Sequence, residues 1–423
     1  MFALVDVNNF YASCEQLFDP MLRDRPIVVL SNNDGCAVSR SAEARALGIP
    51  MGAPWHQWRA RMRPHGVVAL SSNYTLYADM SDRVVEVLSA YTPEMEVYSI
   101  DESFLDVSGC RDRLKLGLEI RERIWTWLGL AVCVGIGPTK TLAKLANHAA
   151  KKRPQFGGVC DLDAMPTDQR DALLADIEVG EVWGVGRRLR ARLEAMDIRT
   201  VAALRDADVQ TIRDRFGVVL ERTVRELRGT SCLNLELVAS AKQQIICSRT
   251  FGGYIQDIDT LRAAVSTYTA RAAEKLRAQD SVAGSLQVFI QTNPFREKGG
   301  AAAQYQRGTT IPLPDPTADT MLLVQWALRG LDRIFRPGFD YRKAGIMLGN
   351  FSPADRGQLS LLSGQDGERR SRLNSTMDRI NRRWGKGTAR VMVEAIKAPW
   401  AMARGSLSPA YTTEWAGVPV VMA

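Results

Sequence analysis

The stretch VYSIDESFLDVSG, Val97 to Gly109, places two acids, Asp101 and Glu102, between two runs that are typical of buried strands. Neighbouring side chains of a regular strand point to opposite faces of a sheet, so a strand cannot present both carboxylates to one site. A turn at this point breaks the alternation and lets both acids reach the same place. The stretch therefore predicts an antiparallel hairpin with a pair of carboxylates at its turn.

A third acid, Asp6, lies in the apolar run FALVDV (residues 2–7), which is typical of a buried first strand. If this strand lies beside the hairpin, three carboxylates meet and raise one another's pKa unless a cation lies between them. An oxygen-only set favours Mg²⁺, and two such ions about 4 Å apart serve phosphoryl transfer. The alternative is that Asp101 and Glu102 are ordinary solvated turn acids.

Composition places the chain among soluble globular proteins, with 46% hydrophobic and 24% charged residues. Its 423 residues suggest roughly two to four domains. No apolar run reaches the ~18 residues of a membrane span, and the amino terminus lacks the basic lead of a secretory signal, which predicts a cytoplasmic protein. Seven cysteines without a C-x-x-C pair argue against a disulfide framework and against structural zinc. The net charge of +8 is compatible with a polyanionic partner but does not decide the matter.

The pattern of apolar residues changes several times along the chain. Residues 2–162 alternate strands and helices in an order that fits an open sheet with helices on one face. After Pro166 the pattern becomes short and helical, and from Gln244 it becomes a second unit of strands and two amphipathic helices. The first helix is marked by the stripe Leu261, Val265, Tyr268, Ala272 and Leu276, and the second by Leu322, Trp326 and Leu331. Beyond Phe351 Ser, Gly, Pro and Arg dominate, which predicts a tail with weak periodicity. The fold class is therefore α+β with several domains.

Several motifs, taken together, resemble one family. DVNNFYASCE (6–15), SIDES (99–103), VGIGPTKTLAKLAN (134–147) and VWGVGRR (182–188) resemble the palm and thumb motifs of Y-family translesion DNA polymerases, above all of their UmuC-like branch. Further motifs, from SNNDGCAVSRSAEARALGIPMG to YRKAGIMLGNF, follow in the family's order. The resemblance therefore covers nearly the whole chain.

The resemblance implies an error-prone DNA-directed DNA polymerase that adds dNTPs to a primer 3′ end opposite damaged template in the bacterial SOS response. It also implies the right-hand architecture of that family. The expected parts are a ferredoxin-like palm (1–11 and 73–165), small fingers (12–72), a helix-hairpin-helix thumb (166–240), an α+β little finger (241–352) and a regulatory tail (353–423).

The resemblance assigns the metal site. Asp6, Asp101 and Glu102 match the family's catalytic, metal-binding carboxylates, and the backbone carbonyl of Val7 matches an extra ligand, so two Mg²⁺ ions are expected. Tyr11 matches the steric gate, an aromatic ring that clashes with a ribose 2′-hydroxyl. The residues alone favour a core aromatic beside Phe10 at this position.

Ser39, Arg45 and Lys151 match positions that contact the nucleotide triphosphate. Two alternatives remain: Arg45 pairs with Glu43 or Glu15, or the helical face of Lys140, Lys144 and Lys151 is only a solvated surface. Ala42 stands where many archaeal and eukaryotic relatives carry tyrosine, which leaves the tightness of the site open.

The family's DNA and protein contacts map to two further motifs. Gly184 and Gly186 precede Arg187 and Arg188 in the form of a helix-hairpin-helix, with Arg190 and Arg192 behind them, which favours phosphate contact over a simple turn. In the tail, one pentapeptide resembles the docking motif for the bacterial β sliding clamp, although the usual last residue is phenylalanine. That pentapeptide is Gln358, Leu359, Ser360, Leu361 and Leu362.

The basic region 368–388 looks like UmuC-specific sequence, whose relatives bind a UmuD′ dimer and RecA; the alternative is a helix with a charged outer face. Two rival functions are a non-catalytic DNA- and clamp-binding accessory subunit and a palm-like nucleotidyl cyclase. Three mutually repelling acids have no use in an inactive site, which argues against the first rival. The second would need neither a thumb nor a tail.

Overall fold

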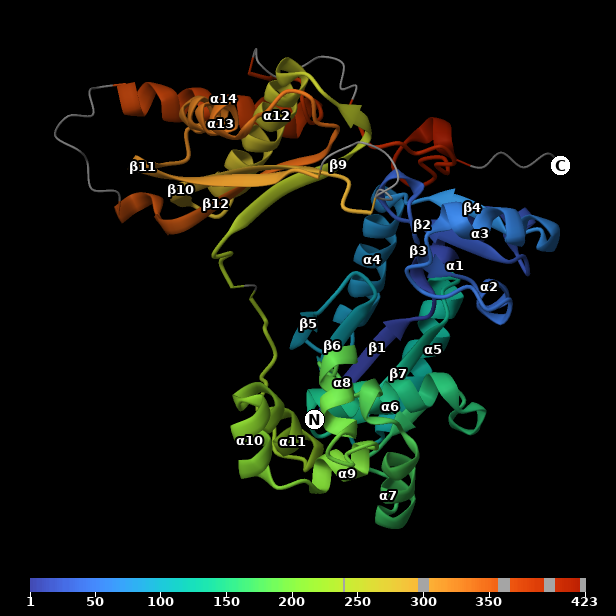
Figure 1. Ribbon diagram of the computed structural model, residues 1–423. Helices are drawn as coiled ribbons and strands as arrows, with labels where there is room; N and C mark the ends of the chain where they lie inside the picture. Colours follow the sequence, from blue (N-terminus) through green and yellow to red (C-terminus); the bar gives the residue numbers. More distant parts are fainter. Residues whose placement is uncertain (239, 296–303, 357–365, 392–399, 419–423) are drawn as a thin grey trace. The chain divides into compact units, whose positions relative to one another are not determined.

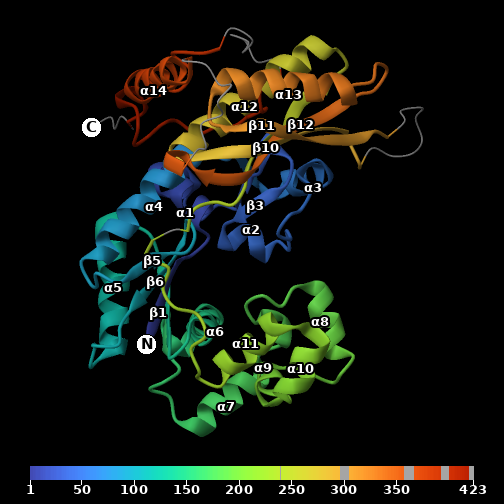
Figure 2. The same cartoon turned by 90° about the vertical axis from the view of Figure 1, so that its left-hand side faces the viewer.

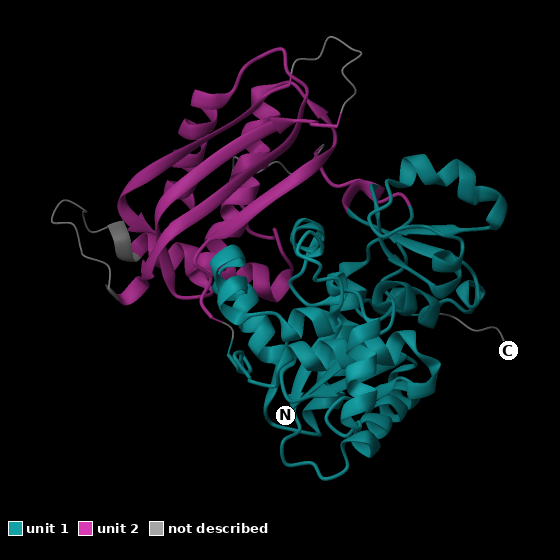
Figure 3. Ribbon diagram, turned by 60° about the horizontal axis from the view of Figure 1, so that its bottom comes forward, with its two compact units in different colours: residues 1–31, 35–239, 406–423 teal, residues 32–34, 240–405 magenta. Residues whose placement is uncertain are grey.

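The computed structural model describes residues 1–418 apart from 239, 296–303, 357–365 and 392–399. The chain forms two compact units (Figure 3). The first comprises residues 1–31, 35–239 and the chain from 406 onward, and the second comprises 32–34 and 240–405. Among the described residues, every helix is too short or too polar to cross a lipid bilayer.

The first unit is built on a five-stranded sheet with the order β5-β6-β1-β7-β8. Its central strand β1 is buried after its first residue and pairs antiparallel with both β6 and β7. The register sets Asp6 opposite Glu102. The strands are β1 (Phe2–Val7), β5 (Met95–Val97), β6 (Glu102–Asp106), β7 (Val132–Gly137) and β8 (Val159–Asp161).

Helices cover both faces of this sheet. Ala3 and Val5 of β1 face α4 (Tyr74–Ser89) and α5 (Arg113–Leu128) in one core cluster. Leu4, between them, packs on the other side against Ala143 of α6 (Lys140–Lys152). The sequence predicted helices on one face only, and α6 makes the difference.

Close contact between β7 and α6 depends on a glycine. A Cβ on Gly135 would overlap the backbone nitrogen of Asn147 and the carbonyl oxygen of Ala143. The missing side chain lets the helix lie directly on the strand. This approach fixes the height of α6 above the sheet, and therefore the reach of the lysines that α6 carries.

The rest of the first unit consists of a small sheet and a helical module. The small sheet has the order β3-β2-β4, and helices α7 to α11 gather beside α6 (Figure 2). The small sheet and the helices around it are β2 (Ile27–Leu30), β3 (Ala37–Arg40), β4 (Val68–Ser71), α1 (Phe10–Phe18), α2 (Ala42–Ala46) and α3 (Trp55–Met62). The module is α7 (Thr167–Asp176), α8 (Arg187–Glu194), α9 (Val201–Asp206), α10 (Val209–Phe216) and α11 (Val218–Leu227).

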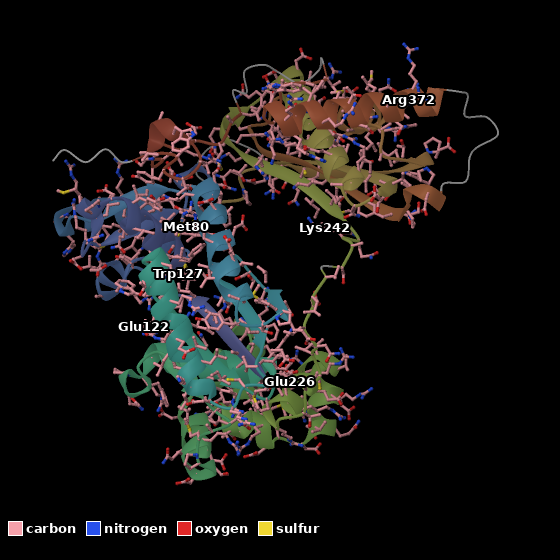
Figure 4. The ribbon with its side chains drawn as sticks, turned by 180° about the vertical axis from the view of Figure 1, so that it is seen from behind. Met80, Glu122, Trp127, Glu226, Lys242 and Arg372 are labelled. Atoms are coloured by element: carbon pink, nitrogen blue, oxygen red, sulfur yellow. The ribbon has the colours of Figure 1, made fainter. Side chains whose placement is uncertain are left out.

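Glu226, labelled in Figure 4, joins the helical module to α6. Its side chain is fully buried and accepts hydrogen bonds from the backbone nitrogen and the hydroxyl of Thr141, at 3.0 and 2.7 Å. The other carboxylate oxygen accepts from the backbone nitrogens of Cys232 and Leu233. The first turn of α6 and the end of α11 are thereby held together.

The second unit is a four-stranded antiparallel sheet of order β11-β10-β12-β9 with two helices packed on it. The predicted stripe from Leu261 to Leu276 is the buried face of α12. In α13 the buried stripe contains Leu323 and Ala327, not the neighbouring Leu322 and Trp326 of the predicted stripe, which are only half-buried. The elements are β9 (Ile245–Ile255), α12 (Ile258–Arg277), β10 (Ser281–Thr292), β11 (Gln306–Thr317), α13 (Thr320–Ile334) and β12 (Tyr341–Pro353).

Part of the predicted tail is ordered. Helix α14 (Asp366–Trp384) packs on the second unit, where Asp378 accepts two hydrogen bonds of 2.7 Å from Arg277. Short 3₁₀ turns complete the chain at η1 (Pro20–Leu22), η2 (Asn32–Asp34), η3 (Arg63–His65), η4 (Pro154–Phe156), η5 (Val179–Glu181), η6 (Ala354–Arg356) and η7 (Trp415–Gly417).

Candidate active site

The three predicted acids are neighbours at the end of the central strand. Asp6 and Glu102 are direct partners across β1 and β6, and opposite residues of an antiparallel pair point to the same face. Asp101 lies in the turn before β6, where its carbonyl oxygen accepts the backbone nitrogen of Val7 at 2.9 Å. The hairpin is confirmed, and its turn lies beside the end of β1 as predicted.

Two lysines of α6 hold two of these acids. Lys151 Nζ lies 2.5 Å from Asp6 Oδ1, and Lys144 Nζ lies 2.7 Å from Glu102 Oε1. Both acids face α6 because they alternate with the residues that face α4 and α5. The lysines therefore meet the carboxylates directly across the contact between α6 and the sheet.

Neighbouring contacts extend the same network. Lys140, one turn before Lys144, is buried and paired with Glu96 of β5. The hydroxyl of Ser99 donates to Asp101 Oδ1 at 2.6 Å. The lysine face of α6 is therefore directed at acids of the sheet and is not a merely solvated surface.

Lys144 has a role that the sequence did not reveal. Its ammonium group lies 4.5 Å from the ring centroid of Tyr98 and 5.3 Å from that of Trp183, while it bonds Glu102. Rings of this kind stabilise a cation through their negative faces. The sequence indicated only that Lys140 and Lys144, one helical turn apart, share one face of the helix.

Burial raises the pKa of Asp6 from 3.8 to about 6; Lys151 opposes this rise, and the nearby Glu102 and Asp101 carboxylates add to it. Such a carboxylate gains strongly from a nearby cation. The oxygen donors fit hard divalent ions. Among the described residues, no three His, Cys, Asp or Glu side chains converge closely enough to hold a metal, because lysine and serine partners engage each acid.

A cleft of about 490 Å³ opens at this end of the sheet. It is lined by predicted metal, sugar and triphosphate residues from β1, α1, β3, α2 and α6. Glu102 is paired with Lys144 outside this lining. The predicted site residues that line the cleft are Asp6, Val7, Tyr11, Ser39, Arg45, Asp101 and Lys151.

Tyr11 lines the cleft and is only half-buried, whereas its neighbour Phe10 is a core residue with 3% exposure. The chain enters α1 through Asn9, whose φ of 50° is left-handed. Asparagine tolerates this conformation better than most residues. The Tyr11 ring stacks on Tyr77 of α4, with centroids 4.3 Å apart and planes at 12°. Tyr11 also packs against the core cluster that contains Phe10, so its role as a steric gate stays a prediction.

The triphosphate candidates surround the same turn. Ser39 donates to the carbonyl oxygen of Asn9 and accepts from the backbone nitrogen of Ala12, each at 3.2 Å. Arg45 is exposed and donates to the side-chain oxygen of Asn9. Glu15, the proposed alternative partner of Arg45, is buried elsewhere, so that pairing is wrong.

The helix-hairpin-helix candidates occupy the start of α8. Gly184 has a φ of 87°, which favours glycine, and α8 begins directly after Gly186. Arg187 and Arg188 are exposed there. The two arginines expected behind them are occupied: Arg190 pairs with Glu178 and Glu194, and Arg192 bonds the carbonyl oxygen of Arg215. The clamp-motif candidates, Gln358 to Leu362, lie outside the described residues.

Comparisons with known proteins agree with this geometry. The model of the impB/mucB/samB family matches residues 5–148, and that of its C-terminal domain matches 242–361. A domain of unknown function, DUF4113, matches 371–421.

Individual relatives extend this match over almost the whole chain. Protein UmuC of Salmonella typhimurium is 47% identical over 420 residues, covering 98% of each chain. A DNA polymerase IV of Pelotomaculum thermopropionicum is 27% identical and covers 90% of this chain and 92% of its own.

The fold itself also has solved counterparts. A Y-family DNA polymerase chimera of Dbh and Dpo4 is 20% identical, with a TM-score of 0.66, over 84% of this chain and all of its own. The architecture is therefore the α+β, multidomain fold of Y-family polymerases. From the family matches and the full-length identity to UmuC together, the chain belongs to the impB/mucB/samB family, as a UmuC-like protein.

Proposed function

We propose that the protein is an error-prone, DNA-directed DNA polymerase that extends a primer opposite damaged template in the SOS response. The observation that supports this proposal is a cleft lined by the carboxylates of Asp6 and Asp101, the ring of Tyr11 and the cations Arg45 and Lys151. The names of relatives, UmuC and DNA polymerase IV, support it. A non-catalytic accessory subunit is not favoured, because the relatives include a DNA polymerase IV that covers 90% of this chain.

Asp6, Asp101, Glu102 and the carbonyl of Val7 are the residues that would hold two Mg²⁺ ions. When bound, such ions neutralise charge on the phosphates and on the attacking oxygen. Each acid has a neutral or cationic partner that it must exchange, and Lys151 is the partner that also lines the cleft. Once Asp6 releases it, the Lys151 ammonium can bind a phosphate of the incoming nucleotide.

The other lining residues are assigned to different parts of the incoming nucleotide. Arg45 is exposed at the cleft and offers a planar fork that suits a phosphate. Ser39 holds the turn at Asn9, and so orients that side of the cleft. The Tyr11 ring lies under the expected sugar position, where a 2′-hydroxyl would collide with it. Arg187 and Arg188, with the glycines before them, bind a DNA phosphate without reading bases.

In this scheme the five-stranded sheet is the palm, the small sheet the fingers, the helical module the thumb and the second unit the little finger. Asp101→Asn tests the assignment. The variant should lose nearly all nucleotide addition, by about 1,000-fold or more, because it weakens a cation site that acts mainly in the transition state. Its affinity for primer-template DNA should stay within a few fold, since most DNA contacts lie in other domains.

Asp106→Asn is the matched control, because Asp106 ends β6, the strand that follows Asp101, and its carboxylate accepts hydrogen bonds from the backbone nitrogen and the hydroxyl of Ser108. It should extend primers at the normal rate. Normal extension by Asp101→Asn in a gel-based assay with Mg²⁺ would overturn the metal assignment. Activity lost equally in both variants would point to a damaged strand instead.

We also propose the β sliding clamp, a UmuD′ dimer and RecA as partners, supported by the family resemblance of the tail. Replacing Gln358, Leu359, Leu361 and Leu362 by alanine should leave distributive synthesis intact and abolish stimulation by the clamp. Equal stimulation of the variant and the natural chain would make this pentapeptide an ordinary part of the tail.

A further inference from the structure

A segment near the end of the chain packs against its beginning. Residues 406–411, named here the C-terminal strap, belong to the first unit and lie within the match to the domain of unknown function. Ser406 exchanges two hydrogen bonds with Ser71 at the end of β4, of 2.9 and 3.1 Å. The ring of Tyr411 stacks on Phe18 of α1, with centroids 5.2 Å apart. In Figure 1 this red segment lies against the blue part of the ribbon.

Ser408, in the middle of the strap, reaches a buried acid. Its hydroxyl accepts from Asn73 Nδ2 at 2.9 Å and donates to Glu15 Oε1 at 3.1 Å. Asn73 also caps α4 through the backbone nitrogen of Leu76, so the strap is fixed to a helix start. The hydroxyl is therefore held with a defined direction toward Glu15.

Glu15 connects the strap to the aromatic stack of the cleft. It is 1% exposed, and the same oxygen that accepts from Ser408 accepts the hydroxyl of Tyr77 at 2.6 Å. Tyr77 is fully buried, and its ring stacks on the face of the Tyr11 ring. Glu15 and Tyr11 also lie one turn apart on α1. An unbroken chain of contacts thus leads from the strap to the cleft.

We infer that the C-terminal strap is a positioning element for sugar selection, in which Ser408 acts through Glu15 and Tyr77 on Tyr11. The inference rests on the proposed role of Tyr11 as the steric gate. Discrimination by collision requires a ring that does not yield. A stacked neighbour whose hydroxyl is fixed to a buried carboxylate supplies that resistance, whereas a neighbour free to shift lets the gate move away from a ribose.

The test compares incorporation of matched dNTP and rNTP in single-nucleotide kinetics. Ser408→Ala should lower the ratio of kcat/KM for dNTP to that for rNTP by roughly 3- to 30-fold, mainly by raising rNTP efficiency. Ser408→Thr keeps a hydroxyl and should restore the ratio. Thr413→Ala removes a hydroxyl from an exposed residue two positions after the strap and should leave the ratio unchanged.

A purely structural role of Ser408 predicts equal losses with both nucleotides and an unchanged ratio, which would overturn the inference. Combining Ser408→Ala with Tyr11→Ala should add nothing to the ratio of Tyr11→Ala alone, because both act on one ring. If Ser408→Ala does not fold, Tyr77→Phe keeps the stacked ring but removes the hydroxyl that donates to Glu15, and it should relax the ratio in its place.

Failure of the inference can be told from failure of the proposed function. If Tyr11→Ala relaxes sugar selection and neither Ser408→Ala nor Tyr77→Phe does, only the role of the strap is wrong. If Tyr11→Ala itself leaves the ratio unchanged, the steric gate is wrong, and the strap inference falls with it. Loss of polymerase activity in Asp101→Asn bears on neither result.

Discussion

The two larger sheets of this molecule are covered differently. In the first unit helices lie on both faces, and β1 is buried at each position from Ala3 to Val7. In the second unit α12 and α13 pack on one face (Figure 1), and burial alternates along β10. There, charged residues such as Arg249 and Arg307 remain exposed. A charge in the doubly covered sheet has no such outlet, so Asp6 stays buried, and its pKa rises to about 6. Helices on both faces of the sheet thus bury the Asp6 carboxylate and shift its pKa.

The largest expected effect is the loss of folding when the double cover is disturbed. Gly135→Ala should destabilise the first unit by about 3 kcal/mol or more, because the new methyl group overlaps backbone atoms of α6. Gly349→Ala is the matched change in the second sheet, where the nearest atom is the Ser285 hydroxyl at 3.4 Å. It should cost less than about 1 kcal/mol. Chemical denaturation of both variants measures the difference, and similar costs would contradict the comparison.

The second effect concerns the cleft that opens at the end of the doubly covered sheet. Tyr11→Ala should keep measurable dNTP addition and raise the relative efficiency of rNTP addition by roughly 10- to 1,000-fold, the equivalent of ~1.4–4 kcal/mol of lost discrimination.

Tyr11→Phe provides the control, since it keeps the ring and should keep sugar selection. Insertion kinetics with both nucleotides check the result. Loss of all activity by Tyr11→Ala with an unchanged sugar preference would mark Tyr11 as a structural aromatic.

The smallest effect is a difference in pH dependence between the two units. The folded-state pKa of Asp6 lies above its ordinary value of 3.8, so the folded protein holds this proton more tightly than the unfolded chain. In chelator-treated protein the free energy of unfolding should therefore fall as pH rises from about 4 to 6, by on the order of 1–2 kcal/mol. Asp6→Asn should remove that fall, which calorimetry at several pH values measures.

Asp257 of the second unit should behave in the opposite way. Its carboxylate accepts the backbone nitrogen of Thr260 at 2.7 Å, and this hydrogen bond lowers its pKa. Its contribution is present above the ordinary pKa and is lost as pH falls through the folded-state pKa. Asp257→Ala should cost about 1 kcal/mol at pH 7 and less in acid. If the free energies of unfolding of Asp6→Asn and Asp257→Ala changed with pH in the same way, the two units would not differ in how they bury charge.

Sequence predicted best where a pattern is local. The apolar run that carries Asp6, the hairpin acids and the stripe of α12 from Leu261 onward appear as expected. Of the three residues that mark α13 in the sequence, Leu331 is buried, whereas Leu322 and Trp326 are only half-buried and their neighbours Leu323 and Ala327 are buried instead. Helix periodicity alone does not say which of two adjacent apolar stripes meets the sheet.

Other features depend on partners far away in the chain. Helix α4 was not predicted, although Leu76, Met80 and Val84 follow a helical period after the cap at Asn73. Because α4 was not predicted, the sequence did not indicate that Tyr77 of this helix would stack on Tyr11. The strap offers no periodic signal at all, since its contacts are hydroxyls and carbonyls that any loop could carry. Such pairings are fixed by tertiary packing rather than by local propensity.

The contact between Glu15 and Ser408 spans 393 residues, and this separation has a consequence for biosynthesis. A ribosome that adds 5–20 residues per second needs roughly 20–80 s to reach the second residue after the first. All three carboxylates and the cleft lining are made long before that moment. In the proposed scheme, a prematurely terminated chain would carry all three acids but would lack the strap that holds Tyr77 and Tyr11 in place. We expect such a chain to discriminate less strictly between dNTP and rNTP than the full chain does.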